Sequence, residues 1–411
     1  MPLLPNSLTT LSDLTAAPPG GEDLVCFCHL RWNFVFQRPQ HLLTRFARNR
    51  RVFFVEEPVF DSDVPRIDTT RDASGVFVVV PHLAPGLPAA AVAREMRALV
   101  DGLFALENID DYVLWYYTPM ALDFSAHLAP VATVYDCMDE LSAFAHAPAG
   151  LREAERELMR RADVMFTGGQ SLFESKQHLH RNVHAVPSSV DVPHFARARR
   201  ITMDPPDQVD IPRPRLGFFG VLDERLDVPL LAAAASLRPD WHFVLIGPVV
   251  KIDPATLPRA ANVHYLGPKG YAQLPGYVAG WDVALLPFAR NEATRFISPT
   301  KTPEYLAAGR PVVSTSIRDV VRPYGDLGLA HIADTPDAFV EAIAAAIAEP
   351  AAARLASADA FLARTSWDAT HARVAALIDQ AAAANGRRAA AASQPLDRIG
   401  KDQPPCSITS S

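Results

Sequence analysis

Short apolar runs, rich in β-branched and aromatic residues, alternate along this chain with Ala-, Leu- and Arg-rich segments of helical period. The runs are apolar at nearly every position, which is typical of parallel strands buried on both faces. The first half therefore predicts alternating strands and helices. Its strands are expected at Leu24–Cys28, Arg51–Val55, Val76–Val80, Tyr112–Tyr116, Thr133–Tyr135, Val164–Thr167 and Val183–Val186, and its helices near Arg38–Arg48, Ala89–Phe104, Leu151–Arg161 and Ser171–His180.

The alternation stops at residues 199–214, a segment rich in Pro, Arg and Asp without periodicity, which we interpret as a linker. It then resumes in the second half. Strands are expected there at Leu216–Phe219, His242–Ile246, Val263–Leu266, Val283–Leu286, Val312–Ser314 and Leu329–Ile332, and helices near Val228–Leu237, Tyr271–Ala279, Pro299–Ala308, Pro336–Ala348 and Trp367–Ala384.

Two α/β domains follow from this pattern, each a doubly wound parallel sheet covered by helices on both faces. We assign residues 22–198 to the first and 215–365 to the second, followed by a closing helix at 366–385. The ends, 1–21 and 386–411, are expected to be a disordered leader and tail. Because open α/β sheets bind ligands beyond the carboxyl ends of their strands, we expect the site in the cleft between the domains.

Composition narrows the class of protein. Of the 411 residues, 49% are hydrophobic and 21% charged, which excludes a mainly disordered or fibrous chain. The net charge of −7 argues against a dedicated nucleic-acid binder. No apolar run reaches the roughly 18 residues of a membrane span, and the N-terminus lacks the regions of a signal peptide. The cysteines match neither a zinc site nor a disulfide framework, so we expect a cytoplasmic protein; they are Cys26, Cys28, Cys137 and Cys406.

The segment Trp281–Thr315 carries the most chemical information. Ser298 suits the N-cap of its helix and Pro299 the first helical position, so Thr300 and Lys301 fall in the first turn. A hydroxyl, an ammonium and free backbone N–H groups suit a phosphate or diphosphate. Glu304, one turn later, could accept hydrogen bonds from a pair of ribose hydroxyls. The alternative is that Lys301 and Glu304 are a solvated pair on a capped helix.

Pro303 complicates this register. Counted from Ser298, it is the fifth helical position, where a proline removes a hydrogen bond and crowds the carbonyl of Pro299. Alternatively, Thr302 caps a shorter helix that begins with Pro303. In both registers the phosphate-binding turn is distorted.

The same segment resembles the signature of retaining glycosyltransferases with the GT-B fold, in particular glycosyltransferase family four. The residues that carry the resemblance are Glu304, the run Ala307–Gly309 and the run Pro311–Val313. Other segments agree with the pattern: Gly217–Gly220, Asn262–Gly267, Val190–Asp191 with Phe195, and Trp367–Asp368. The N-terminal half resembles a bacterial subgroup that makes cell-surface polysaccharides, through His29–Trp32, Gln37–Leu42 and Tyr135–Glu140.

The resemblance implies a GT-B architecture of two Rossmann-like domains facing across a cleft, with a helix that returns to the first domain. It implies transfer from a UDP- or GDP-linked sugar to a glycan or lipid-linked acceptor, with retention, without a metal or cofactor and without a covalent enzyme intermediate. Two departures stand out. Phe296 occupies the place of the Glu that usually faces the transferred sugar, and Arg225 is the one cation in residues 220–225.

Fixed cations and N–H groups can stabilise a diphosphate leaving group by electrostatic preorganisation. We therefore assign catalytic roles to Arg225, Lys301, Asp136, Asp139 and His29, the last three as groups that could position the acceptor hydroxyl. Donor binding is assigned to Gly220, Tyr265, Gly267, Ser298, Thr300, Lys301 and Glu304. Acceptor binding is assigned to Arg31, Trp32, Gln37 and Arg38.

Each of these assignments has a structural alternative. Asp136 and Asp139 could be helix caps or turn residues, His29 a plain loop histidine, and Trp32 and Tyr265 packing residues. Asp61-Ser62-Asp63 has the form of a metal-binding Asp-x-Asp motif, but it lies in a Pro- and Asp-rich loop of the first domain.

A basic cluster formed by Arg45, Arg48, Arg50 and Arg51 ends a predicted helix. It could complement the helix dipole or contact anionic lipid in a peripheral association with the membrane. Two other functions stay open: a nucleotide-sugar epimerase on the same fold, and a non-catalytic partner in polysaccharide assembly. Activity without an acceptor would distinguish the first, and failure to bind donor nucleotides the second.

Overall fold

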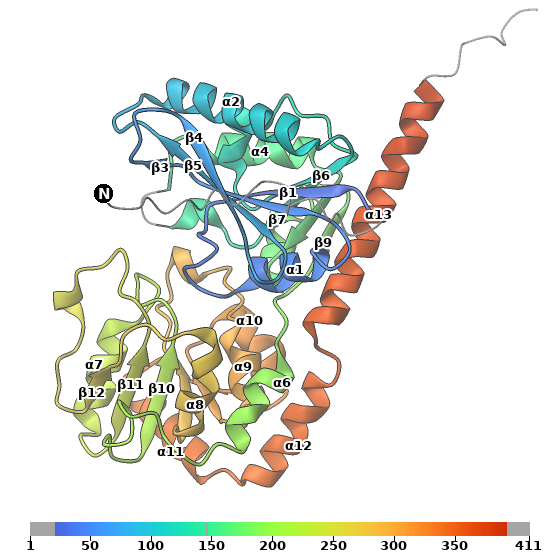
Figure 1. Ribbon diagram of the computed structural model, residues 1–411. Helices are drawn as coiled ribbons and strands as arrows, with labels where there is room; N and C mark the ends of the chain where they lie inside the picture. The colour runs from blue at the N-terminus through green and yellow to red at the C-terminus, as the bar shows by residue number, and fades with distance from the viewer. Residues whose placement is uncertain (1–20, 145–146, 393–411) are drawn as a thin grey trace, which may run out of the picture.

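The computed structural model describes residues 21–144 and 147–392, which form two α/β domains (Figure 1). The predicted leader, apart from Gly21, lies outside the described residues, and so do residues 393–411 of the predicted tail. Each domain is built on one sheet, as the strand pattern indicates. The fold class is therefore α/β with two parallel sheets, as predicted.

The N-terminal sheet has nine strands in the order β3-β5-β2-β1-β6-β7-β8-β9, and β4 pairs with β5. All pairs are parallel except β4 with β5. The strands are β1 (Asp23–Cys28), β2 (Val52–Glu56), β3 (Val59–Phe60), β4 (Arg66–Arg71), β5 (Phe77–Leu83), β6 (Tyr112–Tyr116), β7 (Ala132–Cys137), β8 (Val164–Thr167) and β9 (Val183–Ala185). The helices of this half are α1 (Arg38–Phe46), α2 (Ala89–Glu107), α3 (Leu122–Ser125), α4 (Leu151–Arg161) and α5 (Gln170–Lys176).

The C-terminal sheet has six parallel strands in the order β12-β11-β10-β13-β14-β15, the classic doubly wound order. The strands are β10 (Arg215–Phe219), β11 (His242–Ile246), β12 (Val263–Tyr265), β13 (Val283–Leu286), β14 (Val312–Ser314) and β15 (His331–Ile332). The remaining helices are α6 (Val192–Ala196), α7 (Val228–Leu237), α8 (Leu274–Ala279), α9 (Lys301–Ala307), α10 (Arg318–Val320), α11 (Pro336–Ala348), α12 (Ala351–Leu362) and α13 (Trp367–Ala392).

Single turns of other helix types link these elements. They are η2 (Pro119–Ala121), η3 (Leu141–Ala143), η4 (Arg197–Arg199), η5 (Pro254–Thr256), η6 (Tyr271–Gln273), η7 (Glu292–Thr294) and η8 (Val321–Gly325). The predicted linker, residues 199–214, contains no strand or α-helix. It runs directly into β10 and packs with the C-terminal domain, because Ile211 belongs to the same apolar cluster as Phe195 and Leu216. The chain passes between the domains earlier than this segment, at residues 186–191.

Both sheets reverse their winding direction next to the first strand of the domain. In the N-terminal sheet this point lies between β1 and β6, and in the C-terminal sheet between β10 and β13. Crevices at such points, outside the carboxyl ends of the strands, are where doubly wound sheets bind ligands. The loops that follow β1, β6, β10 and β13 are therefore the first places to look for a site.

The last helix, α13, packs on α1 and on β7 and β8 of the N-terminal domain, and Figure 1 shows it running along the side of that domain. Trp367, Val374 and Ile378 are buried in the same apolar cluster as Leu24 and Trp115. The predicted closing helix thus does return to the first domain. Its end was placed too early, because residues 386–392, assigned to the tail, continue the helix. Ala and Arg, both good helix formers, fill most of this extension.

Candidate active site

Gly220 and Lys301 meet at the carboxyl end of the C-terminal sheet. Gly220 ends β10 with φ +148°, a conformation that favours glycine. A Cβ atom at this position would lie 2.4 Å from Cε of Lys301, so the glycine also makes room for the lysine side chain. The site predicted from these two residues is therefore assembled in space.

Helix α9 begins two residues later than predicted, at Lys301, with Thr300 in the N-cap position. Ser298 and Pro299 lie before the helix, so the predicted Ser298 cap is wrong, and so is the alternative cap at Thr302. Pro303 is then the third helical residue, where the N–H has no intrahelical partner and a proline removes no hydrogen bond. The expected distortion is therefore absent, and Lys301 and Glu304 lie on an intact turn.

Lys301 and Glu304 are two titratable groups whose side chains form no hydrogen bond or ion pair with another residue among residues 21–144 and 147–392. Nζ of Lys301 lies 5.9 Å from the ring centre of Phe219. Glu304 is only 8% exposed. Burial raises its pKa to about 8 against the opposing charge of Lys301. Burial lowers the pKa of Lys301, and Glu304 opposes that shift. Uncompensated charge at this depth is costly for the free protein, which is typical of a site completed by a ligand.

Tyr271 is a neighbour of Glu304 that sequence reasoning missed. Its hydroxyl is buried and has no hydrogen-bond partner in the described chain. Burial raises the pKa of Tyr271, and the charge of Glu304 raises it further. The ring stacks on His194 with centroids 4.2 Å apart and touches Phe36 of the N-terminal domain at 4.7 Å. The one available signal was the aromatic residue that opens a predicted helix.

Two more cations, Arg225 and Lys251, lie near Phe144 of the N-terminal domain. Arg225 donates to both oxygens of Asp223, at 2.7 Å from Nη2 to Oδ2, and keeps 27% of its side chain exposed. Its guanidinium lies 5.7 Å from the ring centre of Phe144, which belongs to the N-terminal domain. Nζ of Lys251 lies 5.9 Å from the same ring. Lys251 is therefore a second cation beside Arg225, and it comes from outside residues 220–225.

Lys251 is held there by its loop. The loop after β11 pairs with the loop after β10 through two backbone bonds, Leu222 N to Pro248 O at 2.9 Å and Val250 N to Leu222 O at 3.0 Å. Lys251 itself adopts a left-handed conformation with φ +62°. A lysine just beyond the carboxyl end of a buried strand was the signal that could have found it.

The N-terminal domain contributes Asp139 and His29. Burial raises the pKa of the half-buried Asp139, while the charge of Arg225 opposes the shift. Burial lowers the pKa of His29 to about 4, and the charge of Lys251 lowers it further. His29 is therefore neutral at pH 7, and its Nδ1 is buried without a partner in the described chain. Cations of the C-terminal domain shift the pKa values of both residues, so both side chains face the cleft.

Asp136 and Arg38 were assigned to catalysis and acceptor binding, and both assignments are wrong. They form a fully buried ion pair, with Nε of Arg38 2.9 Å from Oδ2 of Asp136 and exposed fractions of 1% and 0%. Nη1 of Arg38 donates to the carbonyl of Val186 at 2.7 Å. With every polar atom engaged inside the domain, neither side chain can reach a substrate.

Trp32 is likewise a packing residue, which is the structural alternative to acceptor binding given above. It is 5% exposed, and its ring lies 5.0 Å from that of Phe54, edge to face. The backbone N–H of Gln37 donates to Oε1 of Gln40, which fixes the start of α1. Arg31 donates to Oε2 of Glu56 at 2.9 Å. No substrate contact is left for Trp32, while Arg31 supports the wall of a cavity described below.

The other residues that were assigned to donor binding are placed less favourably for contact with a ligand. The hydroxyl of Tyr265 donates to the carbonyl of Pro258 at 2.9 Å, a local loop contact. The carbonyl of Gly267 accepts from the N–H of Gly247, and Gly267 adopts φ +68°. Ser298 lies beside Asp319 on the wall of a different cavity, described below. Thr300 is half-buried and makes no side-chain cap.

Phe296, in the place of the expected Glu, packs against an apolar cluster of the N-terminal domain. Its ring also lies 5.1 Å from the guanidinium of Arg295. This loop of the C-terminal domain is thus fixed to the N-terminal domain by an apolar contact at the position where a carboxylate was expected.

A cavity of about 460 Å³ opens at the carboxyl ends of β1, β2 and the residues after β6. Its walls are mostly apolar, and Glu57 and Asp123 stand exposed on its rim. Nη1 of Arg31 donates to the backbone carbonyl of Glu57 at 2.6 Å. Cys28, which lines the cavity, directly precedes His29. This cavity therefore lies beside the loop that carries His29.

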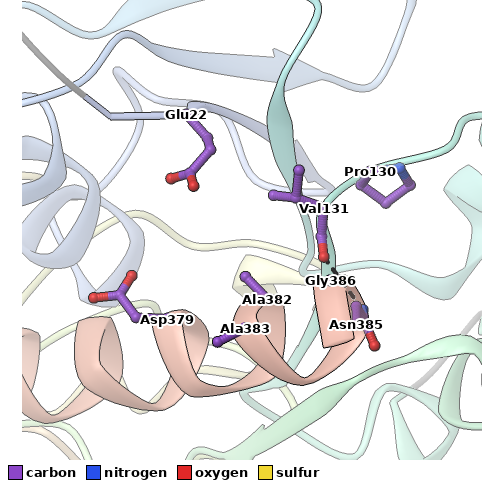
Figure 2. A pocket seen from close by; sticks show the side chains of 8 residues that line it. All are labelled: Glu22, Pro130, Val131, Asp379, Ala382, Ala383, Asn385 and Gly386. Atoms are coloured by element: carbon purple, nitrogen blue, oxygen red, sulfur yellow. Dashed lines mark hydrogen bonds between the residues drawn. The ribbon is translucent and has the colours of Figure 1, made fainter. Parts of the chain in front are cut away.

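Another cavity, of about 570 Å³, lies at the opposite end of the same sheet (Figure 2). Val131 and Glu22, at the amino ends of β7 and β1, face α13 across it, and Asn385 donates to the carbonyl of Val131 at 3.2 Å. Its position at the amino ends of the strands separates it from the cleft.

The Asp-x-Asp motif and the basic cluster have local partners. Asp61 lies 2.6 Å from Nδ1 of His82. The four arginines each face a carboxylate: Arg45 and Arg48 face Asp368, Arg50 faces Glu22 and Arg51 faces Asp23. Among the helices described, none combines the length and the apolar character that crossing a bilayer requires.

Comparisons with known proteins agree with this architecture. Residues 213–349 match the family described as Glycosyl transferases group 1. A Bacillus subtilis (strain 168) protein, described provisionally as the teichuronic acid biosynthesis glycosyltransferase TuaH, is 27% identical over 244 residues, or 54% of this chain. The chain spans 60% of the length of that curated relative.

Solved structures resemble most of the chain. Sucrose-phosphate synthase from Thermosynechococcus elongatus superposes with a TM-score of 0.64 at 14% identity, covering 91% of this chain and 100% of that chain. A UDP-forming trehalose-phosphate synthase from Burkholderia xenovorans gives 0.64 at 14% identity, with 88% and 100% covered. Anabaena HepE in complex with UDP and glucose gives 0.61 at 14% identity, with 87% and 100% covered. The chain therefore has the GT-B fold, and residues 213–349 of its C-terminal domain are similar to the glycosyl transferases group 1.

Proposed function

We propose that the protein is a retaining glycosyltransferase that moves a sugar from a UDP- or GDP-linked donor to a glycan acceptor in cell-surface polysaccharide synthesis. The observation that carries the proposal is the unpartnered pair Lys301 and Glu304 beside Gly220, at the switch point of a domain of glycosyl transferases group 1 type. The relative's name, which refers to teichuronic acid biosynthesis, supports the polysaccharide context.

The donor's diphosphate belongs among Lys301, Arg225 and Lys251. Negative charge grows on the diphosphate as the anomeric C–O bond breaks, and fixed cations stabilise it without reorganisation. Glu304 lies one turn along α9 and accepts hydrogen bonds from the ribose hydroxyls, with the hydroxyl of Tyr271 as a further partner. The cations thus supply the leaving-group stabilisation, and we propose that the reaction needs no metal.

The acceptor belongs in the 460 Å³ cavity of the N-terminal domain. Aromatic and apolar walls, including Phe60 and Phe124, pack against the C–H faces of sugar rings, while Glu57 and Asp123 accept from their hydroxyls. Carboxylates at the rim disfavour a phosphate there. We therefore propose a neutral sugar as the group that enters the cavity, in a glycan or at the far end of a lipid-linked acceptor.

His29 and Asp139 lie on the acceptor side of the cleft. The neutral imidazole of His29 can hold the attacking hydroxyl and orient its lone pair toward the anomeric carbon. The proton of that hydroxyl passes to the departing diphosphate oxygen on the same face of the sugar, which gives retention without a covalent intermediate. The cations around the diphosphate make this leaving group stable enough to depart first.

A nucleotide panel tests the donor site. At a nucleotide concentration about 100 times Kd, the native state gains about 2.7 kcal/mol, a readable rise in Tm. We expect one of UDP or GDP, and its sugar conjugates, to stabilise the wild type and Glu341→Ala, an exposed control on α11, but not Lys301→Ala/Glu304→Ala. If no nucleotide shifts the wild type, the donor site is refuted and a non-catalytic partner role replaces it.

A second experiment tests the reaction. The donor identified by the panel is incubated with neutral oligosaccharides, and the anomeric configuration of the product is read by NMR. Retention and dependence on acceptor support the proposal. Conversion of the donor sugar without any acceptor would instead identify an epimerase.

A further inference from the structure

The chain crosses between the two domains twice, at residues 186–191 and 363–366, and a cavity of about 340 Å³ lies at these crossings. We propose that this cavity, the hinge cavity, binds a phosphate-bearing anion and thereby fixes the relative position of the domains. The cavity is separate from the donor site, since neither Lys301 nor Arg225 lines it.

Three arginines give the hinge cavity its charge. Arg322 comes from η8 of the C-terminal domain, Arg364 from the second crossing and Arg373 from α13. Arg364 has no carboxylate partner in the described part of the chain, and Arg373 donates to the carbonyl of Ala185 at 3.1 Å. Arg322 faces Asp326 at 3.5 Å with its side chain 68% exposed. Among the described residues, Arg364 is therefore free to meet an anion, and the exposed guanidinium groups of Arg322 and Arg373, with one contact each, keep further N–H donors for it.

Asp319 also lines the cavity, but its carboxylate already accepts hydrogen bonds from within the protein. Its two oxygens accept from the backbone N–H groups of Gln170 and Ser171, each at 2.9 Å, at the start of α5. The carboxylate is thus compensated by the N-terminus of α5, and the balance of free charge in the cavity stays positive.

The cavity offers donors as well as charge. Ser189, on the first crossing, is 2% exposed, and its Oγ has no hydrogen-bond partner in the described chain. Ser366 and Thr370 line the cavity from the start of α13, a helix of 26 residues whose positive end lies there. A buried, unpartnered hydroxyl beside guanidinium groups is the donor set that a phosphate group needs.

These groups come from different parts of the chain, so an anion bound to them would affect how the two domains are arranged. An anion held by Arg322 and Arg373 at once would join the C-terminal domain to the helix that belongs to the N-terminal core. A ligand that binds only one arrangement of two domains shifts the population toward it. The hinge cavity can therefore couple the level of a phosphorylated metabolite, or of free phosphate, to the closure of the cleft.

Isothermal calorimetry with the full chain tests the site, using inorganic phosphate and glucose 6-phosphate at constant ionic strength against chloride. We expect binding by the wild type, by Lys301→Ala, and by Arg94→Gln, an exposed control on α2. Arg364→Gln/Arg373→Gln should bind at least 10-fold more weakly, and Ser189→Ala several-fold more weakly. Tighter binding of glucose 6-phosphate than of inorganic phosphate identifies a phosphate monoester as the ligand, and the reverse identifies free phosphate.

Equal affinity of the wild type and the double arginine variant would overturn the proposal, and so would loss of binding in Lys301→Ala, which would place the phosphate at the donor site. If the double variant does not fold, Arg364→Gln alone decides, because this side chain is exposed and has no structural partner among the described residues. The test does not depend on transferase activity, so the hinge cavity and the proposed function can fail separately.

Discussion

The guanidinium of Arg38 and the carboxylate of Asp136 form a two-pronged ion pair in the centre of the N-terminal domain, with Nε–Oδ2 and Nη2–Oδ1 distances of 2.9 Å each. The pair joins α1 to the end of β7, and a further bond to Val186 ties both to the first domain crossing. It therefore connects three segments that surround the cleft, without lining it.

We predict that Asp136→Asn destabilises the protein by about 3–5 kcal/mol, because it leaves the charge of Arg38 buried and unpaired. Urea unfolding measures the loss. The transferase activity of the variant that remains folded should stay within about threefold of the wild type. A variant of normal stability that lacks activity would restore Asp136 to the catalytic residues.

Replacing Lys301 and Glu304 together should increase stability, whereas Asp136→Asn decreases it. Lys301→Met/Glu304→Gln removes two poorly solvated charges that lack partners, so we expect a gain of about 1 kcal/mol with loss of nucleotide binding. Wild-type stability should fall as pH rises from about 4.5 to about 8 and level off above that, because burial raises the pKa of Glu304 to about 8 in the folded state while the unfolded chain already ionises near its ordinary value of 4.5. Thermal unfolding between pH 5 and 9 should show this fall in the wild type and not in the double variant.

His29 should titrate near pH 4, because burial and Lys251 disfavour its charged form. The Cε1 proton resonance, assigned by its absence in His29→Asn, measures this directly. Since the folded-state pKa lies below the unfolded value, His29 reduces stability as pH falls from about 6.5 to 4, and His29→Asn should reduce that loss. A midpoint near 6.5 would show that the side chain is solvated and would remove it from the acceptor side of the cleft.

Asp319 of the C-terminal domain caps α5 of the N-terminal domain. We predict that Asp319→Ala costs about 1–2 kcal/mol and loosens the domain contact, because two backbone donors lose their acceptor. Small-angle scattering should show a larger radius of gyration than in Asp337→Ala, an exposed control on α11. An unchanged radius would mean that the other contacts between the domains, such as those of Phe296 and of Phe36 with Tyr271, hold them without this cap.

The order of strands and helices was readable from the sequence because parallel strands buried on both faces form continuous apolar runs. β6, β8, β11, β13 and β14 begin and end at the predicted residues. The short β3 and the exposed β4 were missed because their residues are polar or too few to show a pattern. Helix α12 was missed because its apolar residues have only weak helical periodicity.

The donor side of the site was predictable to the extent that it is local. Gly220, Lys301 and Glu304 share one motif and lie together. Asp136 and Arg38 are 98 residues apart, and no local pattern distinguishes a carboxylate that meets a buried arginine from one that faces the cleft. Lys251 reaches the site only because two loops pair, a long-range contact that neither loop sequence indicates alone.

The contribution of α13 to the N-terminal core sets the order in which the chain can mature on the ribosome. Leu24 and its neighbours are synthesised first, yet Trp367, Val374 and Ile378 complete the apolar layer on their face of the sheet. The nascent first domain must therefore wait, with an uncovered apolar face, while the whole second domain is translated. Usually the N-terminal domain finishes folding first. Here translation of the last helix completes it, and chaperones have a long-lived hydrophobic surface to bind until then.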